Sequence, residues 1–311
     1  MTVNVVPQGA LVYGIQLPVQ AKSVRTSAEW ERGPEIGTQE LVRAAIACDD
    51  AGFFYIAVCD HVSVPQTAAV DIGMSYTWYE PVATLSYLAG ITKNARLMTN
   101  VYVAAYRHPL LTAKTFATLD ALSGGRLILG IGAGHLEAEF NSLGVDFLAR
   151  GSITNDAIDQ IIGAWAATPA QLPAPLQSPR PPIWAGGSGT PALRRVAERC
   201  DGWIPQGTPR KDMAASIATI TALRDAVRSG ERLDIGYIHE YIYIGDETWD
   251  FGDYTVSGSD DRIIAKCNEM GAMGVNHLQI RLRARDIEEF CDQAAAFGER
   301  IGPHLVGKGS L

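Results

Sequence analysis

Short apolar runs alternate with helical patterns along most of this chain. A helical pattern typically ends near a glycine, and a continuous apolar run follows, as where ELVRAAIACDDAG leads into FFYIAV. Glycine suits the left-handed residue that closes a helix, and short, uniformly apolar runs are typical of strands buried on both faces. The runs that follow this pattern are residues 11–17, 53–59, 96–103, 126–131, 183–186, 202–205, 235–244 and 275–282.

Strands that alternate with helices form parallel sheets through right-handed crossovers. Eight such units in a chain of 311 residues predict an α/β fold, a (β/α)8 or TIM barrel with loop insertions at the face where the strands end. A doubly wound sheet is the weaker alternative, because no G-x-G-x-x-G pattern follows the first strand. The Pro-rich stretch 168–184 joins a helix to the fifth strand and predicts an extended surface loop. We therefore expect one domain over residues 1–311.

Composition narrows the classes of function. The net charge of −8 argues against nucleic acid or an anionic membrane as a general partner, and no apolar run approaches bilayer-spanning length. The five cysteines are scattered and show no C-x-x-C spacing. They predict reduced thiols in a cytoplasmic protein and give no ligand pattern for a metal site.

The second apolar run ends on two ionisable residues, Asp60 and His61. In a barrel of this class the catalytic groups lie at the C-terminal ends of the strands. The plainer alternative is that Asp60 caps a loop and His61 is a polar surface residue. Their place at a strand end favours a functional site, with His61 as a candidate acid or base.

The fourth run leads into glycines at every second position from 130 to 134. Glycines there allow a backbone or a flat ligand ring to approach closely, although a tight turn before a helix also explains them. His135 follows at once and is a second candidate acid or base, since nothing about a helix start requires an imidazole. We expect Glu137 and Glu139 to be helix-start acids favoured by the helix dipole rather than catalysts.

Four small residues follow the fifth run, namely Gly186, Gly187, Ser188 and Gly189. Thr190 is the predicted N-cap of the next helix, and Pro191 its first residue. Free backbone N–H groups, a hydroxyl and a helix N-terminus together predict an anion site, most naturally for phosphate. The alternative is simply a well-capped helix after a flexible loop.

Three further strand ends carry polar candidates. Asn100, followed by Val101, ends the third run, where a buried amide is costly unless it bonds a core partner or a ligand. Gln16, at the end of the first run, is suited to bond the edge of a ring. Arg283 is one of three alternating arginines after the last run, which suit either an anionic ligand or nearby surface acids.

Three stretches together resemble the luciferase-like monooxygenase superfamily, whose members are bacterial-luciferase-like (β/α)8 enzymes that use flavin or deazaflavin. They are AGFFYIAVCDHVSVP, RHPLLTAKTFATLDALSGGRLILGIGAGHLEAEFNSLGV and PPIWAGGSGTPALRRVAERCDGWIP. The resemblance covers most of the chain. The Asp-His pair at positions 60 and 61 is similar to the branch that uses coenzyme F420, with FMN as the alternative cofactor.

This resemblance implies a role for each candidate. Asp60 would touch the deazaflavin or its polyol, and His61 would act as acid or base near the hydride-carrying carbon. The Asn100–Val101 bond matches a non-proline cis peptide that presses on the ring in many relatives. The cofactor channel would be lined by Gly132, Ala133 and Gly134, the phosphate held by Gly186 to Gly189 with Thr190, and the anionic tail met by Arg283. The family also implies a homodimer.

One departure concerns the proton donor, because this chain has His135 where many relatives carry Trp and others Glu. The residues 62–79, rich in Met and aromatic side chains, predict an apolar substrate pocket or a dimer contact. The expected function is F420-dependent hydride transfer to or from a small, apolar organic substrate. The alternatives are an FMN-dependent monooxygenase, a non-catalytic flavin-binding barrel and an unrelated barrel for a phosphorylated metabolite.

Overall fold

The computed structural model describes residues 2–18, 37–65, 78–167, 173–251 and 254–308. Its main feature is a closed ring of parallel strands, because β10 pairs with both β1 and β8. Around the ring the strands are β1 (Val12–Gln16), β2 (Tyr55–Val58), β3 (Arg96–Thr99), β5 (Leu127–Gly132), β6 (Ile183–Gly186), β7 (Gly202–Ile204), β8 (Asp234–Ile242) and β10 (His277–Leu282). All eight coincide with predicted runs, which confirms the (β/α)8 barrel.

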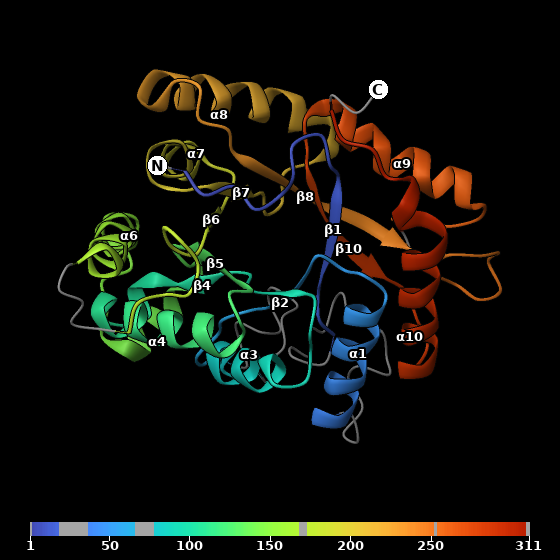
Figure 1. The fold of residues 1–311 in the computed structure, drawn as a ribbon, viewed down its shortest axis with the longest axis horizontal. Coiled ribbons are helices and arrows are strands. Elements are labelled where there is room, and N and C mark those ends of the chain that lie inside the picture. Colours follow the sequence, from blue (N-terminus) through green and yellow to red (C-terminus); the bar gives the residue numbers. More distant parts are fainter. Residues whose placement is uncertain (1, 19–36, 66–77, 168–172, 252–253, 309–311) are drawn as a thin grey trace.

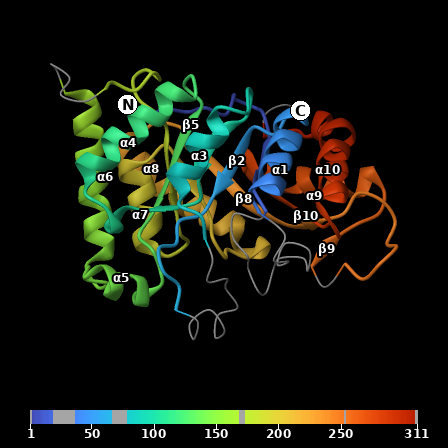
Figure 2. The same ribbon diagram turned by 90° about the horizontal axis from the view of Figure 1, so that it is seen from below.

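The helices form an outer layer around this ring (Figures 1 and 2). They are α1 (Thr38–Asp50), α3 (Pro81–Ala89), α4 (Pro109–Leu122), α5 (Glu137–Leu143), α6 (Arg150–Ala166), α7 (Thr190–Arg199), α8 (Met213–Arg228), α9 (Asp260–Met273) and α10 (Ile287–Ala296). Short additions are β4 (Tyr102–Val103), β9 (Thr255–Val256), η2 (Ala104–Tyr106), η3 (Arg210–Asp212), η4 (Phe297–Ile301) and η5 (Gly302–His304). The expected surface loop is confirmed for residues 173–179, whereas residues 180–182 are buried.

Two of the three apolar clusters among the described residues hold the barrel together. The larger one joins the outer faces of the strands to the helices, and a smaller one contains Tyr55, Trp184 and Ile204. The ring of Trp184 stacks on that of His277, with centroids 4.1 Å apart. Burial lowers the pKa of His277 to about 3, so this ring is neutral at physiological pH. Tyr55, Trp184 and His277 lie over glycines of neighbouring strands, which leave room for these large rings.

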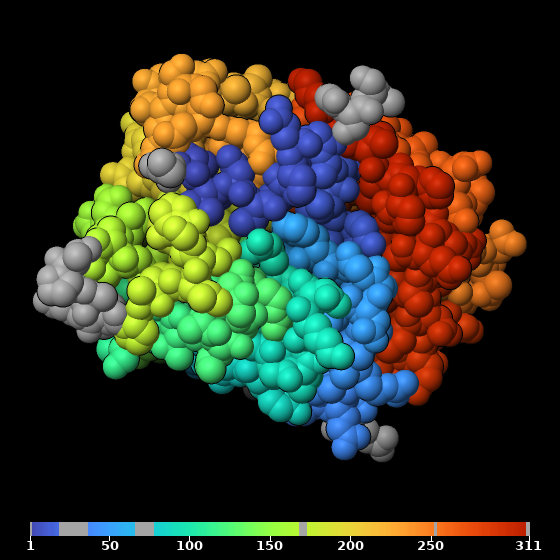
Figure 3. Space-filling model, viewed as in Figure 1, coloured from blue at the N-terminus to red at the C-terminus, as the bar shows by residue number. Residues whose placement is uncertain are grey.

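The segment before β1 crosses the N-terminal face of the barrel, which is turned toward the viewer in Figure 3. The Val3 N–H donates to Asp201 Oδ1 at 2.8 Å, and the Val5 N–H donates to Asp234 Oδ2 at 3.0 Å. Both carboxylates lie at the starts of strands and are buried. These two hydrogen bonds hold the segment across the N-terminal face of the barrel. The C-terminal face is therefore the one that remains open for a site. None of the described helices is both long and apolar enough to cross a bilayer.

A glycine in the barrel interior gives a direct test of this packing. A Cβ atom at Gly236 would lie 2.2 Å from His277 Cε1, so Gly236→Ala should destabilise the fold by roughly 1–3 kcal/mol through overpacking. The control is Gly163→Ala in α6, where a Cβ would meet nothing within 4 Å and where alanine favours the helix. Urea unfolding measures both variants. An unchanged midpoint for Gly236→Ala would contradict the packing described.

Candidate functional site

A cavity of about 470 Å³ opens at the ends of β2, β3, β5 and β6. Twelve of the fifteen predicted site residues line it, and they are Asp60, His61, Asn100, Val101, Gly132, Ala133, Gly134, His135, Gly186, Gly187, Ser188 and Gly189. The three others, Gln16, Thr190 and Arg283, are not on its wall. The strand ends thus bring together residues from four parts of the chain.

Val101 forms the floor of the cavity. The Asn100–Val101 peptide bond is cis, as the resemblance implied. A Cβ atom at Gly132 would lie 2.4 Å from Val101 Cγ2, and one at Gly186 would lie 2.9 Å from Val101 Cγ1. The two glycines are therefore required by the approach of this side chain. A side chain at Gly134 would also collide with Val103, at 2.8 Å.

Asn100 is held from below by two amides. Its Nδ2 donates to Gln279 Oε1 at 2.6 Å and to Gln16 Oε1 at 3.4 Å, and the residue is 1% exposed. Of the two explanations for a buried asparagine here, the structure shows a core partner. Gln16 reaches the site through Asn100 rather than through the cavity wall.

Asp60 is buried and bound on both oxygens. Arg107 forms a bidentate pair with it, Nη1 to Oδ2 at 2.6 Å and Nη2 to Oδ1 at 3.0 Å. The Val103 N–H also donates to Oδ2, at 2.9 Å. The guanidinium matches the buried charge, which would otherwise be costly. This pair ties the end of β2 to the segment after β4.

Glu139 is a helix-start acid, as predicted, and its side chain also lines the cavity. It is 1% exposed and lies within the first turn of α5. Its Oε2 is 2.9 Å from His61 Nδ1, and its Oε1 accepts the N–H groups of Val62 at 2.5 Å and Ser63 at 3.0 Å. Burial alone would raise the pKa of Glu139, but His61 and these two donors bring it below its usual value.

Two aromatic rings flank His61. The His135 ring lies edge-on to it, with centroids 5.7 Å apart, and the Trp78 ring lies at 4.4 Å. Partial burial in the cavity, together with His61, lowers the pKa of His135, although this residue stays open to solvent. Trp78 belongs to the stretch 62–79 predicted to shape a substrate pocket, of which residues 66–77 lie outside the described residues.

The other end of the cavity is formed by the loop 186–189 and two arginines. The N-cap of α7 is Gly189, one residue earlier than predicted, so Thr190 is the first helical residue. Arg195 is buried and donates to Asn155 Oδ1 and the Gly151 carbonyl. Arg150 packs over the ring of Phe147. Neither guanidinium has a carboxylate partner among the described residues, so this end suits an anion.

Two of the alternating arginines at the end of β10, Arg283 and Arg285, lie away from this cavity. Arg283 packs over Tyr241 at 3.6 Å and donates to Thr255 Oγ1. Arg285 pairs with Glu289. Within the described ranges, no cluster of three or more His, Cys, Asp or Glu side chains is arranged to hold a metal ion.

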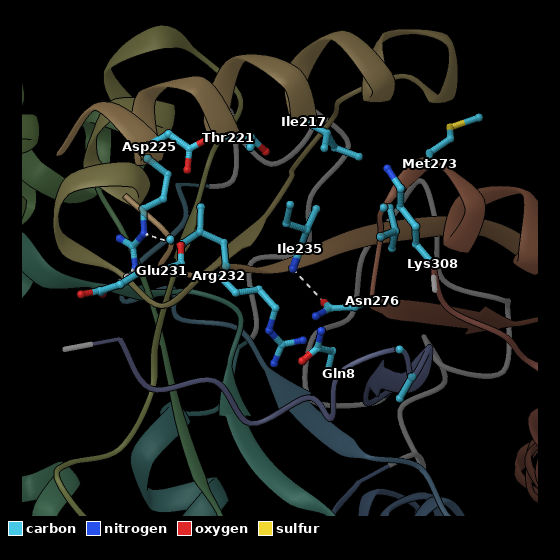
Figure 4. A pocket seen from close by; sticks show the side chains of 17 residues that line it. Gln8, Ile217, Thr221, Asp225, Glu231, Arg232, Ile235, Met273, Asn276 and Lys308 are labelled. Carbon is cyan, nitrogen blue, oxygen red and sulfur yellow. Dashed lines mark hydrogen bonds and ion pairs between the residues drawn. The ribbon is translucent and has the colours of Figure 1, made fainter. Parts of the chain in front are cut away.

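A second cavity, of about 450 Å³, lies at the opposite face, between α8 and the starts of β8 and β10 (Figure 4). Several of its polar groups bond within the fold. Arg224 donates to the carbonyls of Ala197 and Cys200, and the Ile235 N–H donates to Asn276 Oδ1. The N-terminal face of such barrels generally serves stability. We therefore place the candidate site at the C-terminal face.

Several polar residues of the site had no functional assignment from the sequence. Arg107 pairs with Asp60, and Glu139 bonds His61, while Arg150 and Arg195 lie beside the loop 186–189. Only Arg107 gave a usable signal, because it is a charged residue soon after a buried strand end. The others depend on how helices pack over the barrel mouth, which residue spacing does not record.

Comparison with known proteins identifies the family. Residues 15–248 match the family described as luciferase-like monooxygenase. A 5,10-methylenetetrahydromethanopterin reductase from Methanopyrus kandleri is 27% identical over 233 residues, which span 65% of this chain and 62% of that relative. The chain thus matches less than two thirds of the relative's length.

Two solved structures share the whole barrel. Monooxygenase RslO1 from Streptomyces bottropensis superposes with a TM-score of 0.77 and 20% identity, covering 94% of this chain and 99% of that one. An F420-dependent secondary alcohol dehydrogenase, solved with an F420-acetone adduct, superposes with a TM-score of 0.74 and 14% identity, covering 95% and 99%. At these identities the likeness shows the fold.

The Asp60–Arg107 pair predicts a large effect on stability. Arg107→Leu would leave the buried carboxylate without its cation, and we expect a loss of roughly 3 kcal/mol in the free energy of unfolding. The control is Arg43→Leu, whose pair with Glu288 is exposed on both sides and should contribute little to stability, because water screens it. Equal losses for the two variants in urea unfolding would contradict the buried pair.

The lowered pKa of Glu139 predicts a pH dependence. A carboxyl whose pKa is lower in the folded state stabilises the fold above its unfolded pKa, near 4.5, and this contribution is lost as the pH falls through the folded pKa. The stability difference between the wild type and Glu139→Gln should shrink as the pH falls below about 4.5. Unfolding measured on both sides of this pH tests it. A difference that grows as the pH falls below about 4.5 would have the wrong sign.

Proposed function

The chain belongs to the luciferase-like monooxygenase family, and on that premise we propose that it is a coenzyme F420-dependent oxidoreductase. It would transfer a hydride between the deazaflavin and a small, apolar organic substrate, and it would work as a homodimer, as the family resemblance implies. The family comprises oxidoreductases and monooxygenases that use F420 or FMN.

One observation carries the proposal. A single cavity places an Asp-His strand end and a second histidine at one end, and a glycine loop with two arginines at the other. The first end resembles the F420-using branch, and the second has the donors and charge that a phosphate requires. The Methanopyrus kandleri relative, described as a methylenetetrahydromethanopterin reductase, supports a reductive rather than an oxygenating reaction.

The residues present fit such a cofactor. Val101 offers an apolar floor for a flat ring, and it stands there only because Gly132 and Gly186 lack Cβ atoms. The N–H groups of the loop 186–189 and the guanidinium groups of Arg150 and Arg195 would hold the phosphate. Asp60 would act through its neighbours, because both its oxygens are bonded to Arg107.

A bound deazaflavin supplies two-electron hydride chemistry and reacts poorly with oxygen. The protein's part is to bind, to orient and to handle the proton that accompanies the hydride. His61 lines the cavity and would take up or release that proton. Because the pKa of His135 is lowered, this ring would be neutral at physiological pH. It could then donate a hydrogen bond to the substrate or accept one from it.

A paired titration of the purified protein with F420 and with FMN tests the cofactor assignment. We expect F420 to bind and FMN to give no response. Arg195→Leu should weaken F420 binding by about 10- to 100-fold, since a charged hydrogen bond to phosphate is lost. The matched control is Arg199→Leu on the same helix, whose pairs with Asp159 and Glu198 lie outside the cavity.

His61→Ala should keep F420 binding within about twofold, because His61 is assigned to proton transfer and not to the phosphate end. Preference for FMN would overturn the F420 assignment and favour the monooxygenase alternative, to be followed by oxygen consumption. Binding of neither cofactor would overturn the assignment of the cavity to this class of ligand.

A further inference from the structure

We infer that Glu139 is a positioning residue that fixes the proton of neutral His61 on Nδ1 and thereby leaves Nε2 as the proton acceptor in the cavity. This inference deepens the proposed function and rests on it for the catalytic meaning of His61. The tautomer itself is a property of the free protein. It follows from four contacts around one buried carboxylate.

The contacts of Glu139 leave it only one role, that of acceptor. Its Oε2 accepts a hydrogen bond from the Tyr106 hydroxyl at 3.0 Å and lies 2.9 Å from His61 Nδ1. Its Oε1 accepts hydrogen bonds from the backbone N–H groups of Val62 and Ser63. These donors favour the ionised form, which is why the pKa of Glu139 is lowered despite burial. An ionised carboxylate has no proton to give.

His61 Nδ1 must therefore donate, because two facing lone pairs would repel. A neutral imidazole carries one N–H, so a proton on Nδ1 leaves a lone pair on Nε2. No hydrogen bond to Nε2 is present among the described residues, and His61 lines the cavity. The rings of Trp78 and His135 both pack against the imidazole and restrict its rotation. When Nε2 takes up a proton, the imidazolium forms an ion pair with Glu139.

The contacts of Glu139 could also serve only to hold the structure together, and an experiment can distinguish this role from control of the His61 tautomer. Glu139 also ties the start of the loop after β2 to α5 through Val62 and Ser63. In Glu139→Gln the amide oxygen still accepts from these two N–H groups, while the amide nitrogen faces His61. Nδ1 must then accept, and the proton moves to Nε2. A structural tether alone predicts no such exchange.

The test is ¹⁵N NMR of the histidine side chains of the free protein at a pH where the rings are neutral. The chain has six histidines, and the His61 signals are those lost in His61→Ala. We expect the Nδ1–H tautomer in the wild type and the Nε2–H tautomer in Glu139→Gln. The matched control is Glu137→Gln, an exposed acid in the same helical turn, which should keep the wild-type tautomer.

An Nε2–H tautomer in the wild type would overturn the inference, even if the Gln variant failed to fold. An unchanged tautomer in a folded Glu139→Gln would overturn it too and reduce Glu139 to a tether. Because the spectra need no cofactor, this result is independent of the titrations. Failure to bind F420 or FMN would remove the proposed function and leave the tautomer assignment standing.

Discussion

The site depends on the close approach of one side chain to two strands. Val101 stands in the barrel mouth where Cβ atoms at Gly132 and Gly186 would otherwise lie, and below it packs against the inner apolar cluster. The floor of the cavity is thus continuous with the stacked rings of the barrel interior. A floor of this kind cannot shift without disturbing that packing, which is dense and resists deformation. The polar residues are arranged around this fixed surface.

Two buried carboxylates organise the end of the cavity that contains His61 in different ways. Asp60 is matched by Arg107, a cation that stays charged at every physiological pH, and this pair is structural in character. Glu139 is matched by His61, whose ring is charged only when it carries a second proton. The end of the cavity at the loop 186–189 is the reverse, with two guanidinium groups and no carboxylate partner among the described residues. The cavity is therefore polarised along its length.

The fold was predictable because its signals are local. Buried parallel strands need continuous apolar runs, and several helices that precede them end at or next to a glycine, so eight runs sufficed to identify the barrel. Strand ends also predicted most of the cavity, since they meet at one face by construction. The N-cap of α7 lies one residue before the predicted Thr190. Gly189 occupies it, because its backbone has the extended dihedral angles of an N-cap and glycine is about as common there as threonine.

What the sequence could not reveal was pairing between distant segments. Glu139 and His61 are separated by 78 positions, and Glu139 sits where helix-start acids are common, so its burial gave no local signal. Arg195 lies in the middle of an amphipathic helix, and its sequence position alone predicts a surface residue. Its burial results from the packing of α7 over Gly151. The role of a charged residue depends on which groups of distant segments it contacts in the folded protein.

A crystal structure of the protein with bound F420 would test the central claim most directly. The account predicts the deazaflavin ring on Val101, with its hydride-carrying face toward His61 and its phosphate against the loop 186–189 and Arg195. A ring bound elsewhere, or a phosphate that avoids these groups, would contradict it.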